Sequence, residues 1–191
     1  SYSGTALNLG AYTLTMSGEG RFSNTYDLVL NNASSKLLLS SSITVDRVST
    51  SLASLGLDVD DDSTVTSLTV GHITPVSIAS GKTLSGAITV TAGSIKLGEA
   101  GTLASTVSMS GGTLDADETL TLSGALSQSG AITIDVASGK SLTYSGAALS
   151  LGAYTLTMSG SGTFSNSNDL VLNHSSSKLL LDSITVDSVS T

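Results

Sequence analysis

Apolar residues alternate with serine or threonine in many short runs along this chain. Examples are Tyr12-Thr-Leu14-Thr-Met16, Ile43-Thr-Val45, Leu120-Thr-Leu122 and Ile132-Thr-Ile134. A period of two with threonine between apolar residues predicts β-strands that bury one face. In the first run we expect Tyr12, Leu14 and Met16 to point inward and the two threonines to point outward.

Glycine, Ser-Gly and asparagine steps separate these runs, which is typical of turns. No stretch combines the i, i+3, i+4, i+7 spacing of an amphipathic helix with capping residues. Even in the stretch 52–62, the best candidate for an exception, we expect loop and strand. The pattern therefore predicts an all-β chain.

A long repeat overlies this short period, because LGAYTLTMSG occurs at Leu9–Gly18 and again at Leu151–Gly160. Residues 1–41 match residues 143–183 at 31 of 41 positions, and residues 43–50 match 184–191 at seven of eight. We interpret 1–141 as one full long repeat unit and 142–191 as the start of the next unit, which matches 1–50. The chain then reads as part of a tandem array that forms a single continuous solenoid, and Ser1 in place of Met fits an internal or mature piece.

The differences between the copies fall on small or polar positions, such as Glu19, Arg21 and Asn32, which become Ser161, Thr163 and His174. Tyr26, replaced by Asn168, is the only aromatic residue lost. The apolar positions are retained, and we expect them to form a ladder of inward side chains. Its predicted members include Leu14, Met16, Leu28, Leu30, Leu120, Leu122, Ile132 and Ile134. A charge at Leu14 or Leu122 should unfold the local coils, whereas Glu19 and Arg21 should tolerate change.

Two shorter sequences also recur. SGAIT occurs at Ser85–Thr89 and again at Ser129–Thr133, and ASGK occurs at Ala79–Lys82 and Ala137–Lys140. The spacing of the SGAIT segments corresponds to two coils of about 22 residues each. Short strands, frequent turns and repeats together predict a parallel β-solenoid, or β-helix, with coils of about 20 residues and about seven coils per long unit. The alternative, a pair of β-sandwich domains, fits less well because the long period divides the chain unevenly.

The composition excludes several classes of function. With no cysteine, the chain has no disulfide scaffold, Cys-ligated zinc or thiol nucleophile. Its net charge of −8 argues against a nucleic-acid partner, since phosphate binding needs clustered Lys and Arg. No apolar run is long enough to cross a bilayer, so we expect no membrane span in this segment.

Few residues offer acid–base chemistry. His174 stands where the first copy has Asn32, and His72 fits a surface turn. A lyase or hydrolase needs clustered carboxylates, and the sequence does not show that Asp115, Asp117 and Glu118 meet Asp135 or a lysine. We therefore expect no enzyme activity, no catalytic residue and no cofactor.

The run Asp58–Asp62 is the densest acidic cluster, but it lacks the ligand spacing of a calcium-binding loop. We expect a solvated loop that protrudes between coils, with structural calcium as the alternative, and no metal site. Gly18–Gly20 and Gly111–Gly112 lack the Lys-Ser/Thr of a phosphate-binding loop. The Thr-x-Thr triplets that begin at Thr13, Thr89, Thr119 and Thr155 are spaced too irregularly for an ice-binding face.

Three segments resemble the strand-repeat regions of secreted bacterial surface proteins: Glu118–Gly124, the Ser-Gly-Ala-Ile-Thr-Ile run that ends at Ile134, and Ser138–Gly146. Autotransporter passengers and filamentous-haemagglutinin-like adhesins are examples of this group. The resemblance implies a right-handed β-helix, export and a role at the cell surface, and it supplies no functional residues.

From these features we expect a structural, non-enzymatic module of an extracellular repetitive fibre, stalk or surface matrix. Its partner would be itself, end to end or laterally. The alternative is an adhesin passenger that binds protein or glycan of a host or neighbouring-cell surface through loops, most plausibly around Val59–Pro75.

Overall fold

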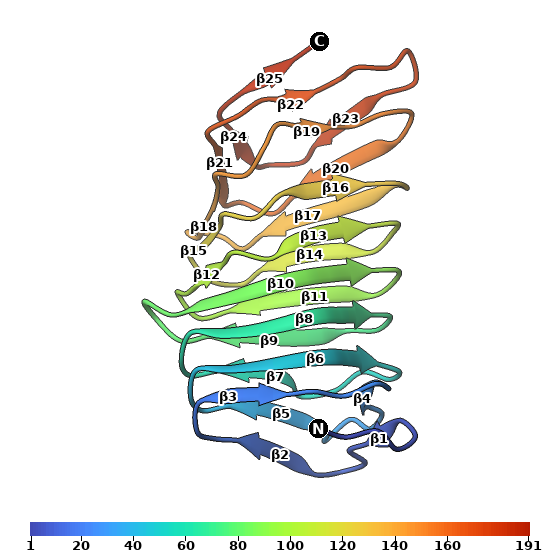
Figure 1. The fold of residues 1–191 in the computed structure, drawn as a ribbon. Coiled ribbons are helices and arrows are strands. Elements are labelled where there is room, and N and C mark those ends of the chain that lie inside the picture. Colours follow the sequence, from blue (N-terminus) through green and yellow to red (C-terminus); the bar gives the residue numbers. More distant parts are fainter.

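The chain forms a parallel β-solenoid of nine turns, seen in a computed structural model that describes residues 1–191 (Figure 1). The turns are stacked from the N-terminal end to the C-terminal end, and strands of successive turns lie side by side. Every pairing between strands is parallel. The all-β solenoid predicted from the sequence is therefore confirmed.

The strands belong to three sheets. The thirteen-stranded sheet contains β1 (Leu7–Asn8), β3 (Gly20–Phe22), β4 (Leu28–Leu30), β6 (Ile43–Thr50), β8 (Ser63–Val70), β10 (Thr83–Val90), β12 (Thr102–Leu103), β13 (Thr106–Met109), β15 (Leu120–Leu122), β16 (Leu126–Gln128), β18 (Ser141–Tyr144), β21 (Thr163–Asn166) and β24 (Thr185–Val186). The nine-stranded sheet contains β2 (Thr13–Met16), β5 (Lys36–Leu39), β7 (Gly56–Val59), β9 (Thr74–Ile78), β11 (Ser94–Gly98), β14 (Thr113–Ala116), β17 (Ile132–Val136), β20 (Thr155–Ser159) and β23 (Lys178–Leu181). The three-stranded sheet contains β19 (Leu149–Ser150), β22 (Leu170–Val171) and β25 (Val189–Ser190).

Each turn contributes one strand to the nine-stranded sheet, and the length of the turn follows from the pairing. The number of residues per turn is smallest where Leu57 pairs with Val76, and it is largest where Ile132 pairs with Leu156. The other turns lie between these two lengths, which confirms the predicted coil of about 20 residues. Longer turns place the extra residues in the corners, where no pairing constrains them.

The two short sequence repeats behave differently in the fold. Both ASGK segments form the turn that leads from the nine-stranded sheet to the thirteen-stranded sheet, and Lys82 and Lys140 donate their amides to Ala79 and Ala137. The SGAIT segments are not equivalent, because the first lies in β10 and the second leads into β17, on different sheets. The interpretation of their spacing as two coils was therefore wrong.

The apolar core is a set of ladders in which one residue of each turn packs on the next. One ladder runs through Leu14, Leu37, Leu57, Val76, Leu97, Ala116 and Val136. The predicted members of the inward ladder are all buried except Leu14, which is partly buried on the first turn. Alternation thus identified the face of each strand that excludes water.

Tyr12 does not point inward, because its side chain is 76% exposed. Gly10 and Ala11 form a turn that leads into β2, and the alternation of inward and outward residues begins only at Thr13. The expectation for Tyr12 was therefore wrong, while Met16 is buried as predicted.

The two sequence copies have the same local pairing. Leu14 pairs with Leu37 in the first copy, and Leu156 pairs with Leu179 in the second. Seven steps through the nine-stranded sheet separate β2 from β20. The ladder that starts at Leu14 does not return to Leu156, the counterpart of Leu14 in the second copy. It reaches Val136, which lies next to Gly160, and Gly160 is two inward positions further along the strand than Leu156. Because the displacement is an even number of residues, inward residues stay inward.

Hydroxyl side chains form columns on the outside of the thirteen-stranded sheet. One column joins Ser49, Thr69, Thr89, Ser108 and Ser127 on successive turns. The Thr-x-Thr triplets do not mark such a column, since Thr13 and Thr155 begin strands of the nine-stranded sheet whereas Thr89 lies in β10. The structure contains no helix that is long and apolar enough to span a membrane.

Candidate functional site: ion pairs, corner residues and the open ends of the solenoid

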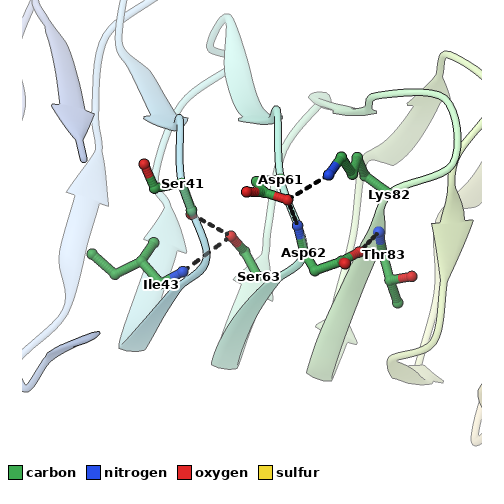
Figure 2. Close-up of polar contacts among 7 residues, drawn as sticks. All are labelled: Ser41, Ile43, Asp61, Asp62, Ser63, Lys82 and Thr83. Atoms are coloured by element: carbon green, nitrogen blue, oxygen red, sulfur yellow. Dashed lines mark hydrogen bonds and ion pairs between the residues drawn. The ribbon is translucent and has the colours of Figure 1, made fainter. Parts of the chain in front are cut away.

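The acidic run Asp58–Asp62 forms a compact connection rather than a protruding loop. Asp58 lies in β7 and is ion-paired with Lys36 of the preceding turn, and Asp61 Oδ1 lies 2.6 Å from Lys82 Nζ of the following turn. Figure 2 shows Asp62 accepting the amide of Thr83 at 2.8 Å. The expectation of a protruding loop was wrong, because these carboxylates join three successive turns.

Electrostatics at this corner follow from the same contacts. The hydrogen bond from Lys82 holds the pKa of Asp61 below its usual range, and that bond and the Asp61 charge raise the pKa of Lys82. No group of three or more histidine, aspartate or glutamate side chains is placed to hold a metal ion.

A second cluster lies on the outside of the nine-stranded sheet, where Lys96 Nζ is 3.2 Å from both Asp115 and Asp117. Asp115 pairs with Asp135 of the next turn, so the structure brings together carboxylates that the sequence left separate. Burial, together with the charges of Asp117 and Asp135, raises the pKa of Asp115 even though Lys96 opposes the shift. Glu118 is ion-paired with Lys140 instead.

An open groove of about 440 Å³ lies beside the acidic corner. Its lining includes Glu19, Thr44, Asp62, Thr64 and Ser85, and Ile43 is its one hydrophobic residue. Ser63 also lines the groove, and its hydroxyl donates to the Ser41 carbonyl of the preceding turn at 3.1 Å (Figure 2). The groove presents hydroxyls and two carboxylates, and its lining does not include Lys96 or Asp115.

The two histidines lie in turns. His72 is exposed between β8 and β9, as predicted. His174 Nδ1 accepts the amide of Ser176 at 3.0 Å, as Asn32 Oδ1 accepts the amide of Ser34 at 2.9 Å in the first copy. The exchange of Asn for His therefore retains an acceptor that closes the same turn.

The segment Val59–Pro75, expected to carry adhesin loops, is mostly strand. β8 occupies Ser63–Val70 in the thirteen-stranded sheet, and Val65, Leu68 and Val70 are buried. Within this segment only residues 60–62 and 71–73 lie outside the strands.

Exposed apolar residues instead gather at the corner that precedes the nine-stranded sheet. Tyr12, Leu55 and Ile73 lie just before β2, β7 and β9, and each is at least half exposed. The Lys36 amide donates to Tyr12 and the Leu55 amide donates to Ser35, so the turn that carries β5 lies between Tyr12 and Leu55. Leu55 and Ile73 lie on neighbouring turns, since the Ser54 amide donates to Ile73. Apolar side chains gathered on a surface are typical of interaction sites.

Sequence reasoning missed a pair of buried asparagines. Asn24 Nδ2 donates to the carbonyls of Tyr26 and Arg47 at 2.8 and 2.7 Å, and Asn166 makes the equivalent bonds to Asn168 and Ser188. Retention of a polar residue in both copies was the signal that could have identified them.

The C-terminal end of the solenoid exposes residues that are buried in the first copy. Leu181 is 53% exposed whereas its counterpart Leu39 is fully buried, and Val189 is 45% exposed whereas Val48 is 2% exposed. Lys178 has no ion pair, although every other Lys or Arg has a carboxylate partner. Its counterpart Lys36 pairs with Asp58 of the next turn.

At the N-terminal end the relation is reversed. Leu14 and Phe22 are partly buried, whereas Leu156 and Phe164 are fully buried by the preceding turn. Tyr144 stacks on Phe164 with ring centroids 6.0 Å apart, and its hydroxyl accepts the Leu126 amide at 3.1 Å. Burial raises the pKa of Tyr144. The junction between the copies is therefore as well packed as the rest of the core.

No protein-family model, curated protein or solved structure matches this chain. The fold itself assigns the chain to the β-solenoid proteins, with nine turns and parallel pairing throughout.

Proposed function

We propose that this protein is a structural module of an extracellular repetitive fibre, stalk or surface matrix, built as a tandem array of the long unit. One observation carries the proposal: both copies of the repeated sequence lie in one continuous nine-stranded sheet with the same local pairing. Leu14 pairs with Leu37 in the first copy, and Leu156 pairs with Leu179 in the second. A repeated sequence that repeats its pairing within one solenoid suits a tandem array.

The mechanism in this proposal is mechanical. Backbone hydrogen bonds run from turn to turn along the axis, as in the pairings of β5 with β7 and of β7 with β9. Ion pairs such as Lys36–Asp58 and Lys82–Asp61 also join successive turns. Because each turn is stabilised by its neighbours, units can follow one another without a new core.

The resemblance to strand-repeat surface proteins of bacteria supports export and a place at the cell surface. An acidic, lysine-poor exterior suits a secreted protein, because a net charge of −8 keeps the protein soluble.

The test is electron microscopy of a protein in which three further periods follow Thr191, each a copy of residues 51–191. Seven turns at about 4.8 Å each give about 34 Å per period. The proposal expects unbranched rods of constant width that lengthen by this amount with each period. Beads joined by flexible links, or rods whose width grows, would contradict it.

An adhesin remains the second candidate, favoured by the exposed corner that contains Tyr12, Leu55 and Ile73. In that case the monomeric protein would bind a purified surface glycan or protein. The variant Tyr12→Ser/Ile73→Ser would lose this binding while its unfolding transition stays in place, because both side chains face solvent. Binding that survives this double change would exclude the corner as the adhesive surface.

A further inference from the structure

We infer that the groove beside the acidic corner binds an oligosaccharide that carries free amino groups. The inference is independent of the fibre proposal, because it concerns the side of the solenoid and a soluble ligand. The groove has a volume of about 440 Å³ and is the one cavity of this kind in the chain. Binding sites for small molecules have volumes of about 300–1,000 Å³.

The groove crosses four successive turns of the solenoid. Its lining residues lie at or just before the starts of β3, β6, β8 and β10 in the thirteen-stranded sheet. Of these strands, β6, β8 and β10 are each paired on both sides. Figure 2 shows Ile43, Ser63 and Thr83 at the starts of these three strands. Most of the groove is therefore lined by turns that have a neighbour on each side.

Hydroxyl side chains form the floor of the groove. Thr44 pairs with Thr64, and Thr64 pairs with Ser85, so three hydroxyls lie in one column on the outside of the sheet. Successive members are about 4.8 Å apart along the axis. A hydroxyl both donates and accepts hydrogen bonds. Because Ile43 is the one hydrophobic residue of the lining, this column suits a ligand that carries hydroxyls at intervals along its length rather than an apolar one.

Two exposed carboxylates, Glu19 and Asp62, also line the groove. Each stands just before a strand, and the register of β3, β6 and β8 places them two turns apart. Two turns correspond to about 10 Å along the axis. The carboxylates are thus too far apart to share a metal ion, whose oxygen ligands lie at about 2–2.6 Å. They are placed to accept from two separate donor groups of one extended ligand.

The basic residues closest in sequence to the lining do not neutralise the groove. Arg21 is paired with Asp46 at 2.7 Å, and Lys82 is paired with Asp61 at 2.6 Å. No lysine or arginine is among the lining residues. The groove therefore attracts protonated amines and repels phosphates and acidic sugars. An amino sugar supplies both the amines for the carboxylates and the hydroxyls for the floor, whereas a plain diamine supplies only the amines.

The first test is a titration of the full chain with an oligosaccharide of glucosamine, followed by calorimetry and by amide NMR. We expect one site per chain and the largest amide shifts at Thr44, Thr64 and Ser85. The N-acetylated oligosaccharide, which lacks the charged amines, should bind about tenfold more weakly, because it loses two ion pairs at an exposed site.

Matched variants locate the binding. Asp62→Asn should weaken it about fivefold, and the Asn side chain can still accept the Thr83 amide that Asp62 accepts at 2.8 Å. Asp60→Asn removes the same charge from an exposed position outside the lining and should leave the affinity unchanged. Thr64→Val removes a hydroxyl from the floor and should also weaken binding. Thr69→Val makes the same change in β8 outside the groove and should not.

Several results would overturn the inference. They are the absence of saturable binding, equal affinity for the acetylated oligosaccharide, and equal effects of Asp62→Asn and Asp60→Asn, which would show a non-specific attraction to an acidic protein. Equally tight binding of a plain diamine, unaffected by Thr64→Val, would overturn the assignment to a saccharide. None of these results bears on the rods expected from the fibre proposal, and failure to form rods would leave the groove intact.

Discussion

Leu39 and Leu181 occupy the same position of the long sequence repeat, but the side chain of Leu39 is fully buried and that of Leu181 is 53% exposed. The residues that precede them, Lys-Leu-Leu, are identical. What differs is the next turn, because Val59 pairs with Leu39 and nothing pairs with Leu181 on that side. The two leucines therefore measure, within one molecule, what the addition of a turn contributes.

The first prediction compares these two leucines. Leu39→Ala should lower the free energy of unfolding by about 2–5 kcal/mol, since it leaves a cavity between turns. Leu181→Ala should lower it by less than about 1 kcal/mol, because its side chain is half exposed. Urea denaturation monitored by circular dichroism measures both, and equal effects would show that the second copy is already covered.

The second prediction concerns the close approach of successive turns at Gly56. Gly56 and Gly81 have similar left-handed φ angles of 86° and 75°. A Cβ on Gly56 would lie 1.9 Å from the Pro75 carbonyl oxygen, whereas one on Gly81 meets nothing within 4 Å. Gly81→Ala should cost about 1–2 kcal/mol from backbone strain alone.

Gly56→Ala should lower the free energy of unfolding by about 1–3 kcal/mol more than Gly81→Ala, because the backbone of β9 at Pro75 must move away from the added methyl group. Thermal unfolding of the two variants gives the comparison directly. If Gly56→Ala were no worse than Gly81→Ala, the spacing between β7 and β9 would be looser than the structure shows.

The third prediction concerns the buried asparagine of the first copy. Asn24→Ala leaves the carbonyls of Tyr26 and Arg47 without their side-chain donor, which should cost about 1–3 kcal/mol. The exposed Asn8, replaced by Ser150 in the second copy, is the control, and Asn8→Ser should change stability by less than about 0.5 kcal/mol. Denaturation midpoints that coincide for the two variants would assign no role to the Asn24 side chain.

The fourth prediction is a loss of stability in acid. The Ser23 hydroxyl, with Arg21, lowers the pKa of Asp46, and the hydrogen bond from Lys82 lowers that of Asp61. A lowered folded-state pKa stabilises the fold at pH above about 3.9, and this contribution is lost as the pH falls through the folded-state value. The urea midpoint should therefore fall as the pH is lowered from about 5 to about 3.

The pKa of Asp115 is shifted in the opposite direction to the pKa values of Asp46 and Asp61, so Asp115 provides the control for that prediction. Burial raises its pKa, so protonation of Asp115 favours the folded state and opposes the loss in acid. Asp115→Asn should make the midpoint fall more steeply with acid, whereas Asp46→Asn should make it fall less. The reverse order would contradict the contacts that shift these pKa values.

The strands and their inward faces could be predicted because burial imposes a period of two that the chain displays at Leu120, Leu122, Ile132 and Ile134. The assignment of segments to sheets could not, since SGAIT contains no signal for the corner it follows. The same five residues form a strand with a register shift near Gly86 in β10 and a turn followed by a strand at β17.

The side-chain contacts between successive turns also could not be predicted from the sequence. The pairing of Lys36 with Asp58, or of Lys96 with Asp115, depends on a coil length that varies from turn to turn. Asp58–Asp62 therefore looked like a solvated loop, because its lysine partners lie one coil away on each side. Tyr12 was misplaced for a related reason, since alternation does not show where a turn ends.

Amide hydrogen exchange at Leu39 and Leu181 tests the central claim most directly, namely that units of this sequence can follow one another in one continuous solenoid. In this chain the Leu39 amide should exchange slowly and the Leu181 amide rapidly, because only the first is covered. In a protein where residues 51–142 follow Thr191, both should exchange slowly. Rapid exchange at Leu181 in that longer protein would contradict the claim.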